Sequence, residues 1–251
     1  MKLYGLIGYP LSHSFSKRYF EEKFEKEDLA DCRYENFPLQ SLEELDGLIE
    51  SKPELQGFNV TIPYKERILS RLDRTDENAF DIGAVNTVKI YRQQGKTILK
   101  GYNTDSHGFC ASLLPSLNAT ITDALILGTG GASKAVAFVL KKLGISCLFV
   151  SRTPMRSDHI SYADLCGPVL YHTQLIVNTT PVGTYPDKEA CPDIPYEFIT
   201  GKHLLYDLIY NPPETKFLSR GRERGARVLN GLEMLRLQAE KAWEIWNDDR
   251  E

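Results

Sequence analysis

The sequence lacks several features that would point to whole classes of protein. No apolar run approaches the roughly 20 residues that a helix needs to cross a bilayer, and we expect no signal peptide because no charged-then-apolar leader is visible. The five cysteines are scattered, odd in number and without a C-x-x-C pair, which favours reduced cytoplasmic thiols and no metal site. A net charge of −4 disfavours nucleic acid and anionic membranes as partners, because both bind basic surfaces.

What the 251 residues do contain is the pattern of an α/β protein. Hydrophobic residues make up 42% of the chain, enough for one large core or two medium ones. Short β-branched runs alternate with helical patterns, which predicts mostly parallel sheets and one antiparallel hairpin. We expect strands at 2–7, 33–37, 57–61, 85–91, 97–102, 124–127, 146–150, 175–177, 204–208 and 226–229, and helices at 16–27, 41–51, 133–143 and 231–246. The series divides into two α/β units, with the seam between residues 101 and 116.

A glycine-rich turn separates the strand expected at 124–127 from the helix expected at 133–143. Gly128 permits a tight turn, and Gly130 lets the backbone approach a pyrophosphate. Ser133 is small enough for the helix to pack on the strand, and the helix N-terminus offers free N–H groups to phosphates. The complete strand–turn–helix frame predicts a dinucleotide site rather than a turn without a ligand.

The end of the following strand indicates which dinucleotide binds. An NAD site usually carries an acidic residue there, about 20 residues after the first glycine, to hold the ribose 2′-hydroxyl. Here the strand ends in Ser151, Arg152 and Thr153, with Arg156 close behind. An arginine can pair with a 2′-phosphate through charge-assisted hydrogen bonds. The sequence therefore predicts NADP(H).

Polar residues gather after the strands of the N-terminal half, where an open α/β sheet builds its site. Ser14 and Ser16 follow the first strand, and one of them can serve instead as the N-cap of the next helix. Lys65 follows the third strand and is expected to begin a helix after a proline, a position that opposes the helix dipole and favours a functional role. Two further polar clusters lie at 83–87 and 101–105.

Nine motifs in series make the chain resemble the shikimate dehydrogenase family along almost its whole length. In order they are S-H-S-x-S, N-V-T-x-P-x-K, G-A-V-N-T, N-T-D, G-x-G-G-A-S, S-R-T, N-T-T-P-V-G, D-x-x-Y-x-P-x-x-T and G-L-x-M-L-x-x-Q-A. Each motif alone is weak, but nine with family-like spacing are specific.

The resemblance implies roles position by position. Lys65 and Asp105 match the catalytic pair of the family. The matches to substrate ligands are Ser14, Ser16, Thr61, Asn86 and Gln238, with Tyr210 at the edge of that site. The matches to cofactor contacts are Gly128, Gly130, Gly131, Ala132, Ser133, Ser151, Arg152, Thr153, Arg156, Asn178, Thr179, Gly231 and Met234.

The resemblance also implies an architecture. Residues 1–104, joined by a C-terminal helix at 235–251, would form the α/β substrate-binding and catalytic domain. Residues 105–234 would form a Rossmann-type NADP-binding domain, and a cleft between the two would close on the ligands. The segment 154–173 is short, so a helix and a strand of the second domain are expected to be reduced.

The implied reaction is the NADP-dependent, reversible reduction of 3-dehydroshikimate to shikimate in aromatic amino-acid biosynthesis. A lysine near an aspartate suits the proton transfer, and the sequence leaves open which of Lys65 and Asp105 passes the proton in each direction. Three alternatives stay open: a quinate or dual quinate/shikimate dehydrogenase, a non-catalytic ligand-sensing relative, and a Rossmann domain with an unrelated substrate. The expected partners are a small-molecule substrate and, at most, a second copy of the chain, so monomer and homodimer are both open.

Overall fold

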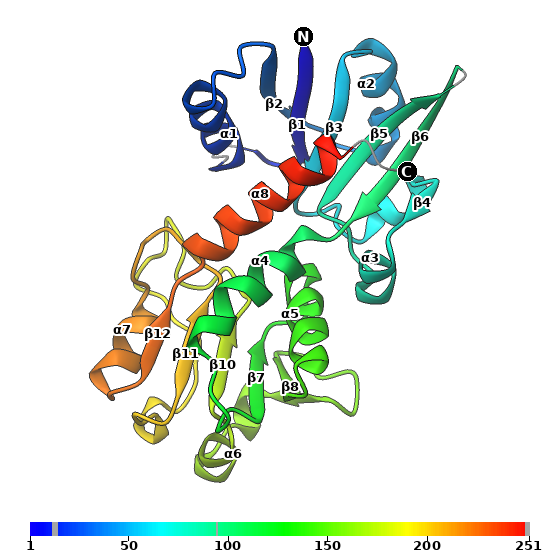
Figure 1. Ribbon diagram of the computed structural model, residues 1–251. Helices are drawn as coiled ribbons and strands as arrows, with labels where there is room; N and C mark the ends of the chain where they lie inside the picture. The colour runs from blue at the N-terminus through cyan, green and yellow to red at the C-terminus, as the bar shows by residue number, and fades with distance from the viewer. Residues whose placement is uncertain (12–14, 94, 249–251) are drawn as a thin grey trace. The chain divides into compact units, whose positions relative to one another are not determined.

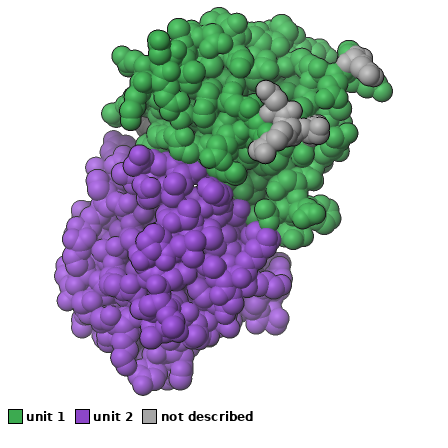
Figure 2. Space-filling view, in the orientation of Figure 1, with its two compact units in different colours: residues 1–104, 239–251 green, residues 105–238 purple. Residues whose placement is uncertain are grey.

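The computed structural model describes residues 1–11, 15–93 and 95–248. The chain forms two compact units, which Figure 2 distinguishes by colour: unit 1 comprises residues 1–104 and 239–251, and unit 2 comprises residues 105–238. The terminal helix α8 (Leu232–Asn247) therefore contributes residues to both units.

Unit 1 is built on a mixed six-stranded sheet (Figure 1). Its strands are β1 (Lys2–Gly8), β2 (Cys32–Pro38), β3 (Leu55–Val60), β4 (Arg74–Thr75), β5 (Thr87–Gln93) and β6 (Lys96–Tyr102), in the order β2-β1-β3-β5-β6-β4. The strands β1, β2 and β3 are parallel, whereas β5 and β6 form the expected antiparallel hairpin. The helices are α1 (Phe15–Lys26), α2 (Leu45–Ser51) and α3 (Glu77–Ile82).

Both faces of the unit 1 sheet are buried, because successive side chains of a strand point to opposite faces. In β1, Leu3 and Ile7 join a core cluster that includes residues of α2 and β3. Tyr4 and Leu6 point the other way and pack with residues of α1 and α8. On that second face a Cβ at Gly57 would lie 2.4 Å from the Trp246 ring, so only glycine leaves room for the indole. The C-terminal part of α8 is thus an integral layer of unit 1.

Unit 2 is built on a fully parallel six-stranded sheet. Its strands are β7 (Asp123–Leu127), β8 (Ser146–Ser151), β9 (His159–Ser161), β10 (Leu175–Asn178), β11 (Leu204–Asp207) and β12 (Arg227–Leu229), in the order β12-β11-β10-β7-β8-β9. Its helices are α4 (Thr104–Leu113), α5 (Gly131–Lys142), α6 (Gly167–His172) and α7 (Lys216–Glu223), with the start of α8. The chain reverses its winding between β7 and β10, which is the order of a doubly wound dinucleotide-binding sheet.

The structure corrects one expectation at Lys65. This residue does not begin a helix: residues 65 and 66 form a turn, and the next helical segment is a 3₁₀-helix at Arg67–Arg71. The physical reason is that the Lys65 carbonyl accepts a hydrogen bond from the Val85 N–H at 2.7 Å, so it is committed outside a helix. The unfavourable helix-dipole position inferred for Lys65 is therefore absent.

Two other segments differ in detail from the sequence pattern. The expected helix at 41–51 consists of a 3₁₀ turn at Leu42–Glu44 followed by α2, and Ser41 and Glu44 form a capping box ahead of it. The short segment after β8 holds the three-residue β9, a 3₁₀ turn at Tyr162–Asp164 and the six-residue α6. Within the described ranges, no helix combines the length and apolar character needed to cross a bilayer.

Candidate active site

Main-chain hydrogen bonds position the polar residues that follow the strands of unit 1. The Thr61 N–H donates to the Ile7 carbonyl at 2.9 Å, which ties the segment after β3 to the end of β1. The Val85 N–H donates to the Lys65 carbonyl at 2.7 Å, and the Val60 N–H donates to the Asn86 carbonyl at 2.8 Å. Thr61, Lys65 and Asn86 are therefore gathered at one edge of the sheet by backbone contacts.

The Asn86 side chain forms two hydrogen bonds with Thr104. Its Oδ1 accepts from the Thr104 N–H at 2.7 Å, and its Nδ2 donates to Thr104 Oγ1 at 2.9 Å. Both residues are buried, so these hydrogen bonds do not compete with water. Thr104 is the last residue of unit 1 and is followed directly by Asp105, in the first turn of α4.

A buried relay of polar side chains supports Ser16, which lies in the first turn of α1. Ser16 is hydrogen-bonded to the Tyr34 hydroxyl, and that hydroxyl donates to Asn59 Oδ1 at 2.8 Å. Asn59 Nδ2 in turn donates to Thr87 Oγ1 at 3.1 Å and to the Asn86 carbonyl at 3.3 Å. Burial raises the pKa of Tyr34, so its hydroxyl stays neutral and able to donate. The relay connects two predicted substrate ligands, Ser16 and Asn86, through residues that the sequence analysis did not select.

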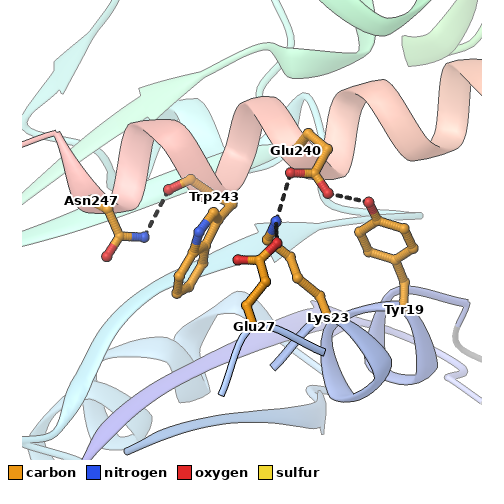
Figure 3. Close-up of polar contacts among 6 residues, drawn as sticks. All are labelled: Tyr19, Lys23, Glu27, Glu240, Trp243 and Asn247. Atoms are coloured by element: carbon orange, nitrogen blue, oxygen red, sulfur yellow. Dashed lines mark hydrogen bonds and ion pairs between the residues drawn. The ribbon is translucent and has the colours of Figure 1, made fainter. Parts of the chain in front are cut away.

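The C-terminal part of α8 is fastened to α1 by a charged cluster (Figure 3). Glu240 accepts from the Tyr19 hydroxyl and from Lys23 Nζ, the latter at 2.8 Å, and Lys23 also pairs with Glu27 at 2.6 Å. Burial lowers the pKa of Lys23, but the hydrogen bonds to Glu240 and Glu27 outweigh it and the pKa is raised. Gln238 lies two residues before Glu240, is buried, and donates from Nε2 to the Leu235 carbonyl at 2.9 Å.

The glycine turn of unit 2 has the geometry that its sequence predicted. Gly128 follows β7 directly with a φ of +105°, and a Cβ there would lie 2.9 Å from Thr179 Oγ1. Gly130 is the N-cap of α5, and a Cβ at this position would meet no protein atom within 4 Å. Ser133 is fully buried and donates from Oγ to the Gly130 carbonyl at 2.6 Å. The turn thus presents open space at the start of α5, which Gly131 and Ala132 begin.

The residues that follow β8 are exposed. Ser151 Oγ accepts from the Thr153 N–H at 3.2 Å, which closes a small turn around Arg152. Arg152 and Arg156 are both exposed, but Arg156 pairs with Asp158 through Nε and Oδ1 at 3.3 Å. The two arginines are therefore not equivalent, because the charge of Arg156 is partly balanced by its neighbour.

The segment after β10 lies against the glycine turn. Thr179 donates to the Leu127 carbonyl through both its N–H at 3.0 Å and its Oγ1 at 2.6 Å. Because β7 and β10 flank the point where the winding reverses, Asn178, Thr179 and Gly128 meet at the edge where such sheets bind ligands.

Three further predicted residues of unit 2, namely Gly231, Met234 and Tyr210, are closely surrounded by other parts of the protein. A Cβ at Gly231 would lie 2.0 Å from the Leu208 carbonyl oxygen, so only glycine fits there. Met234 is buried in a core cluster with Phe109. Tyr210 is half-buried, and burial raises the pKa of its hydroxyl.

The predicted residues thus fall into two groups, each described within its own unit. Unit 1 carries Ser16, Thr61, Lys65 and Asn86, whereas unit 2 carries Asp105, Tyr210, Gln238 and the cofactor contacts. Ser14 lies outside the described residues. Sequence reasoning missed Tyr34, Asn59 and Thr104 as supporting residues. Asn59 and Thr104 had a visible signal, because they stand inside the N-V-T-x-P-x-K and N-T-D motifs, whereas Tyr34 lies outside all nine motifs.

A groove of about 1380 Å³ in unit 2 lies away from these residues. It is lined by residues that precede β10 and β11, including Thr173, Gln174 and His203. The strands are parallel, so this groove is at the amino edge of the sheet, opposite the glycine turn. In the part of the chain that the structure describes, no group of three or more His, Cys, Asp or Glu residues could hold a metal ion.

Comparisons with known proteins agree over nearly the whole chain. Residues 6–88 match the family described as the shikimate dehydrogenase substrate binding domain. A protein of Carboxydothermus hydrogenoformans named shikimate dehydrogenase (NADP(+)) is 38% identical over 98% of this chain and 91% of its own. A protein of Halothermothrix orenii with the same name is 39% identical over 96% and 89%. The structure of shikimate 5-dehydrogenase from Thermus thermophilus in complex with NADP(H) and shikimate is similar with a TM-score of 0.84, 33% identity and coverage of 98% and 94%.

Proposed function

The chain belongs to the shikimate dehydrogenase family, and from that membership we propose which of its residues carry out the reaction. It is an NADP-dependent oxidoreductase that reversibly reduces 3-dehydroshikimate to shikimate in the shikimate pathway of aromatic amino-acid biosynthesis. Its α/β fold, with a Rossmann-type sheet in unit 2, is that of shikimate dehydrogenase structures. The relatives are named as shikimate rather than quinate dehydrogenases, which disfavours the quinate alternative.

Residues 1–104 and the C-terminal helix from residue 235 are proposed to bind the substrate, and residues 105–234 to bind the cofactor. The match of residues 6–88 to a substrate-binding domain supports the first assignment. The parallel sheet with a reversal of winding between β7 and β10 supports the second.

The residues after β7, β8 and β10 fit a dinucleotide phosphate. The unobstructed Cβ position at Gly130 and the free N–H groups at the start of α5 suit the pyrophosphate. Arg152, exposed and held in a small turn, is proposed to pair with the 2′-phosphate, with Ser151 and Thr153 beside it. Asn178 and Thr179 are proposed to border the nicotinamide ribose. When bound, NADPH supplies the hydride for the ketone carbon.

Lys65 and Asp105 are proposed as the catalytic pair. The Lys65 ammonium would donate a proton to the ketone oxygen as negative charge develops on it, and the Asp105 carboxylate would orient that ammonium. The backbone supports this assignment from the unit 1 side: Val85 holds the Lys65 carbonyl, and the adjacent Asn86 holds Thr104, the residue before Asp105. The single observation that carries the proposal is that the dipeptide 85–86 anchors both Lys65 and Thr104, the residue directly before Asp105.

The carboxylate and hydroxyls of shikimate are proposed to be held by Ser14, Ser16, Thr61, Asn86 and Gln238, with Tyr210 at the edge. The polar relay behind Ser16 supports this role, because a hydroxyl fixed by a buried neighbour is pre-organised for a ligand. We propose that the protein acts in the cytoplasm as a monomer or homodimer, which light scattering of the purified protein would distinguish.

The decisive assay is the oxidation of shikimate with NADP⁺, followed by the absorbance of NADPH. Quinate and NAD⁺ serve as controls for the two specificities. We expect turnover with shikimate and NADP⁺ and much lower rates when either is replaced. Binding of NADPH without turnover would instead favour a ligand-sensing role, and equal rates with quinate would favour a dual enzyme.

A further inference from the structure

Asp207, at the carboxyl end of β11, is a fully buried carboxylate that accepts three hydrogen bonds. Its Oδ1 accepts from Asn178 Nδ2 and from the Ile209 N–H, both at 3.0 Å, and its Oδ2 accepts from Thr215 Oγ1 at 2.6 Å. All three donors are neutral. Burial raises the pKa of Asp207 to about 6, although the three hydrogen bonds act in the opposite direction. Burying a carboxylate without a positively charged partner costs free energy, so its presence here indicates a structural or functional role.

The first consequence of this carboxylate is the orientation of the Asn178 amide. An ionised carboxylate can only accept hydrogen bonds, so the Asn178 NH₂ group must face Asp207. The Asn178 oxygen is then directed to Thr180, from whose N–H it accepts at 3.1 Å and from whose Oγ1 it accepts at 2.7 Å. Asn178 Nδ2 also reaches the Val182 carbonyl at 3.4 Å. Asp207 therefore determines how the segment after β10 folds back on itself.

The second consequence concerns the glycine turn. Thr179 and Thr180 pack directly against Gly128, where a Cβ would lie 2.9 Å from Thr179 Oγ1 and 3.0 Å from Thr180 Cγ2. A chain of contacts thus runs from Asp207 through Asn178 and Thr180 to the turn that is proposed to hold the pyrophosphate.

The other oxygen of Asp207 serves a different part of unit 2. Thr215, which donates to Oδ2, is the N-cap of α7 and accepts from the Leu218 N–H at 3.4 Å. The two arms of the network lie on different carboxylate oxygens, so they can be removed separately. Loss of the Thr215 arm disturbs the cap of α7, whereas loss of the Asn178 arm disturbs the wall of the glycine turn.

We propose that Asp207 is a positioning residue for the cofactor: through the Asn178 amide it holds residues 179–182 against Gly128 and so fixes the wall of the dinucleotide site. Asp207 itself touches no cofactor in this proposal. The inference rests on the proposed NADP site at Gly128.

The test compares Asp207→Ala, which removes both arms, with Thr215→Val, which leaves Asp207 and its Asn178 contact in place. For each protein, the dissociation constant of NADPH is measured by fluorescence without substrate, with KM for shikimate and the melting temperature alongside. We expect Asp207→Ala to weaken NADPH binding about tenfold, equal to about 1.4 kcal/mol, and to change KM for shikimate less than twofold. Thr215→Val should lower the melting temperature and leave NADPH binding within twofold.

A swap variant keeps the test decisive if Asp207→Ala folds poorly. Asn178→Asp alone places two carboxylates together and should weaken NADPH binding most, whereas Asn178→Asp with Asp207→Asn restores one donor and one acceptor and should recover binding. Equal effects of Asp207→Ala and Thr215→Val on NADPH binding, or no recovery in the swap, would overturn the proposal. Failure of the unaltered protein to bind NADPH would instead overturn the proposed function.

Discussion

The Asn86 side chain is hydrogen-bonded to both the backbone and the hydroxyl of Thr104. Its Oδ1 accepts from the Thr104 nitrogen at 2.7 Å, and its Nδ2 donates to Thr104 Oγ1 at 2.9 Å. Sequence motifs assign Asn86 to the substrate alone. The structure adds that Asn86 fixes the start of the segment that carries Asp105. One residue is therefore proposed to serve both substrate binding and the placement of the catalytic carboxylate.

Removing these hydrogen bonds should impair catalysis as well as substrate binding. Asn86→Ala leaves the buried Thr104 N–H without its acceptor, at a cost of about 1–3 kcal/mol. If the same energy is lost in placing Asp105, kcat falls about 5- to 150-fold. Thr104→Val is the matched control, because it keeps the backbone contact to Asn86 and loses only the hydroxyl. Steady-state kinetics should show a much smaller change in kcat for Thr104→Val, and equal losses in both variants would contradict the idea.

Lys65→Met tests the proposed proton donor. We expect kcat to fall by about 10²–10⁴, the range for a lost general acid, with a smaller effect on KM for shikimate. Binding of NADPH, measured by fluorescence, should be unchanged because the cofactor residues lie in unit 2. Lys96→Met removes an exposed lysine of the β5–β6 hairpin and should leave kcat unchanged. An unaltered kcat in Lys65→Met would exclude Lys65 from the chemistry.

Arg152→Ala tests the cofactor preference. Loss of a charge-assisted hydrogen bond to the 2′-phosphate should cost about 2–3 kcal/mol in NADP⁺ binding and leave NAD⁺ binding unchanged. Arg156→Ala should cost less, because Arg156 is already paired with Asp158 at 3.3 Å. The measurement is kcat/KM for both cofactors in each variant. An equal loss of kcat/KM with NAD⁺ and with NADP⁺ would show that Arg152 does not bind the 2′-phosphate.

Tyr34→Phe tests the relay behind Ser16. The variant keeps the ring but removes the hydroxyl that Ser16 contacts and that donates to Asn59 at 2.8 Å. We expect KM for shikimate to rise several-fold, with KM for NADP⁺ unchanged. Tyr206→Phe is the control, since it removes another buried hydroxyl, 2.6 Å from Ser112 Oγ, in unit 2. Both variants should lose about 1–3 kcal/mol of stability, so an equal rise of KM for shikimate in the two would refute a role for the relay.

The stability of the protein should depend on pH through Asp207. Burial raises the pKa of Asp207 from 3.8 to about 6, so the folded state binds the proton more tightly than the unfolded state. The resulting stabilisation is fully present below the unfolded pKa and is lost as pH rises through about 6. Relative to Asp207→Asn, the free energy of unfolding should therefore fall by about 2 kcal/mol between pH 4.5 and 7.5. Urea denaturation of both proteins measures this difference, and a constant difference would contradict it.

Local patterns in the sequence were sufficient for most of the secondary structure. The parallel strands, the hairpin of β5 and β6, and the turn at Gly128 follow from hydrophobic periodicity and glycine spacing, which act over a few residues. The helix after this turn was predicted for the same reason, although α5 begins at Gly131 rather than at the expected residue 133. Lys65 was the clear failure, because its carbonyl is taken by Val85, a residue 20 positions away that no local pattern can anticipate.

The sequence by itself determined the family through the order of its motifs. It also predicts the site residues, among them a lysine, an aspartate and an arginine where an NAD site carries an acid. Such features are local, because each depends on a few residues that are neighbours in the sequence. Only the tertiary structure decided which residues support them. Tyr34 contacts Ser16 because α1 packs on β2. Asn86 bonds Thr104 and Asp207 bonds Asn178 because the strands that precede or follow them are neighbours in a sheet. Buried hydrogen bonds of this kind depend on three-dimensional proximity, which the order of residues does not state.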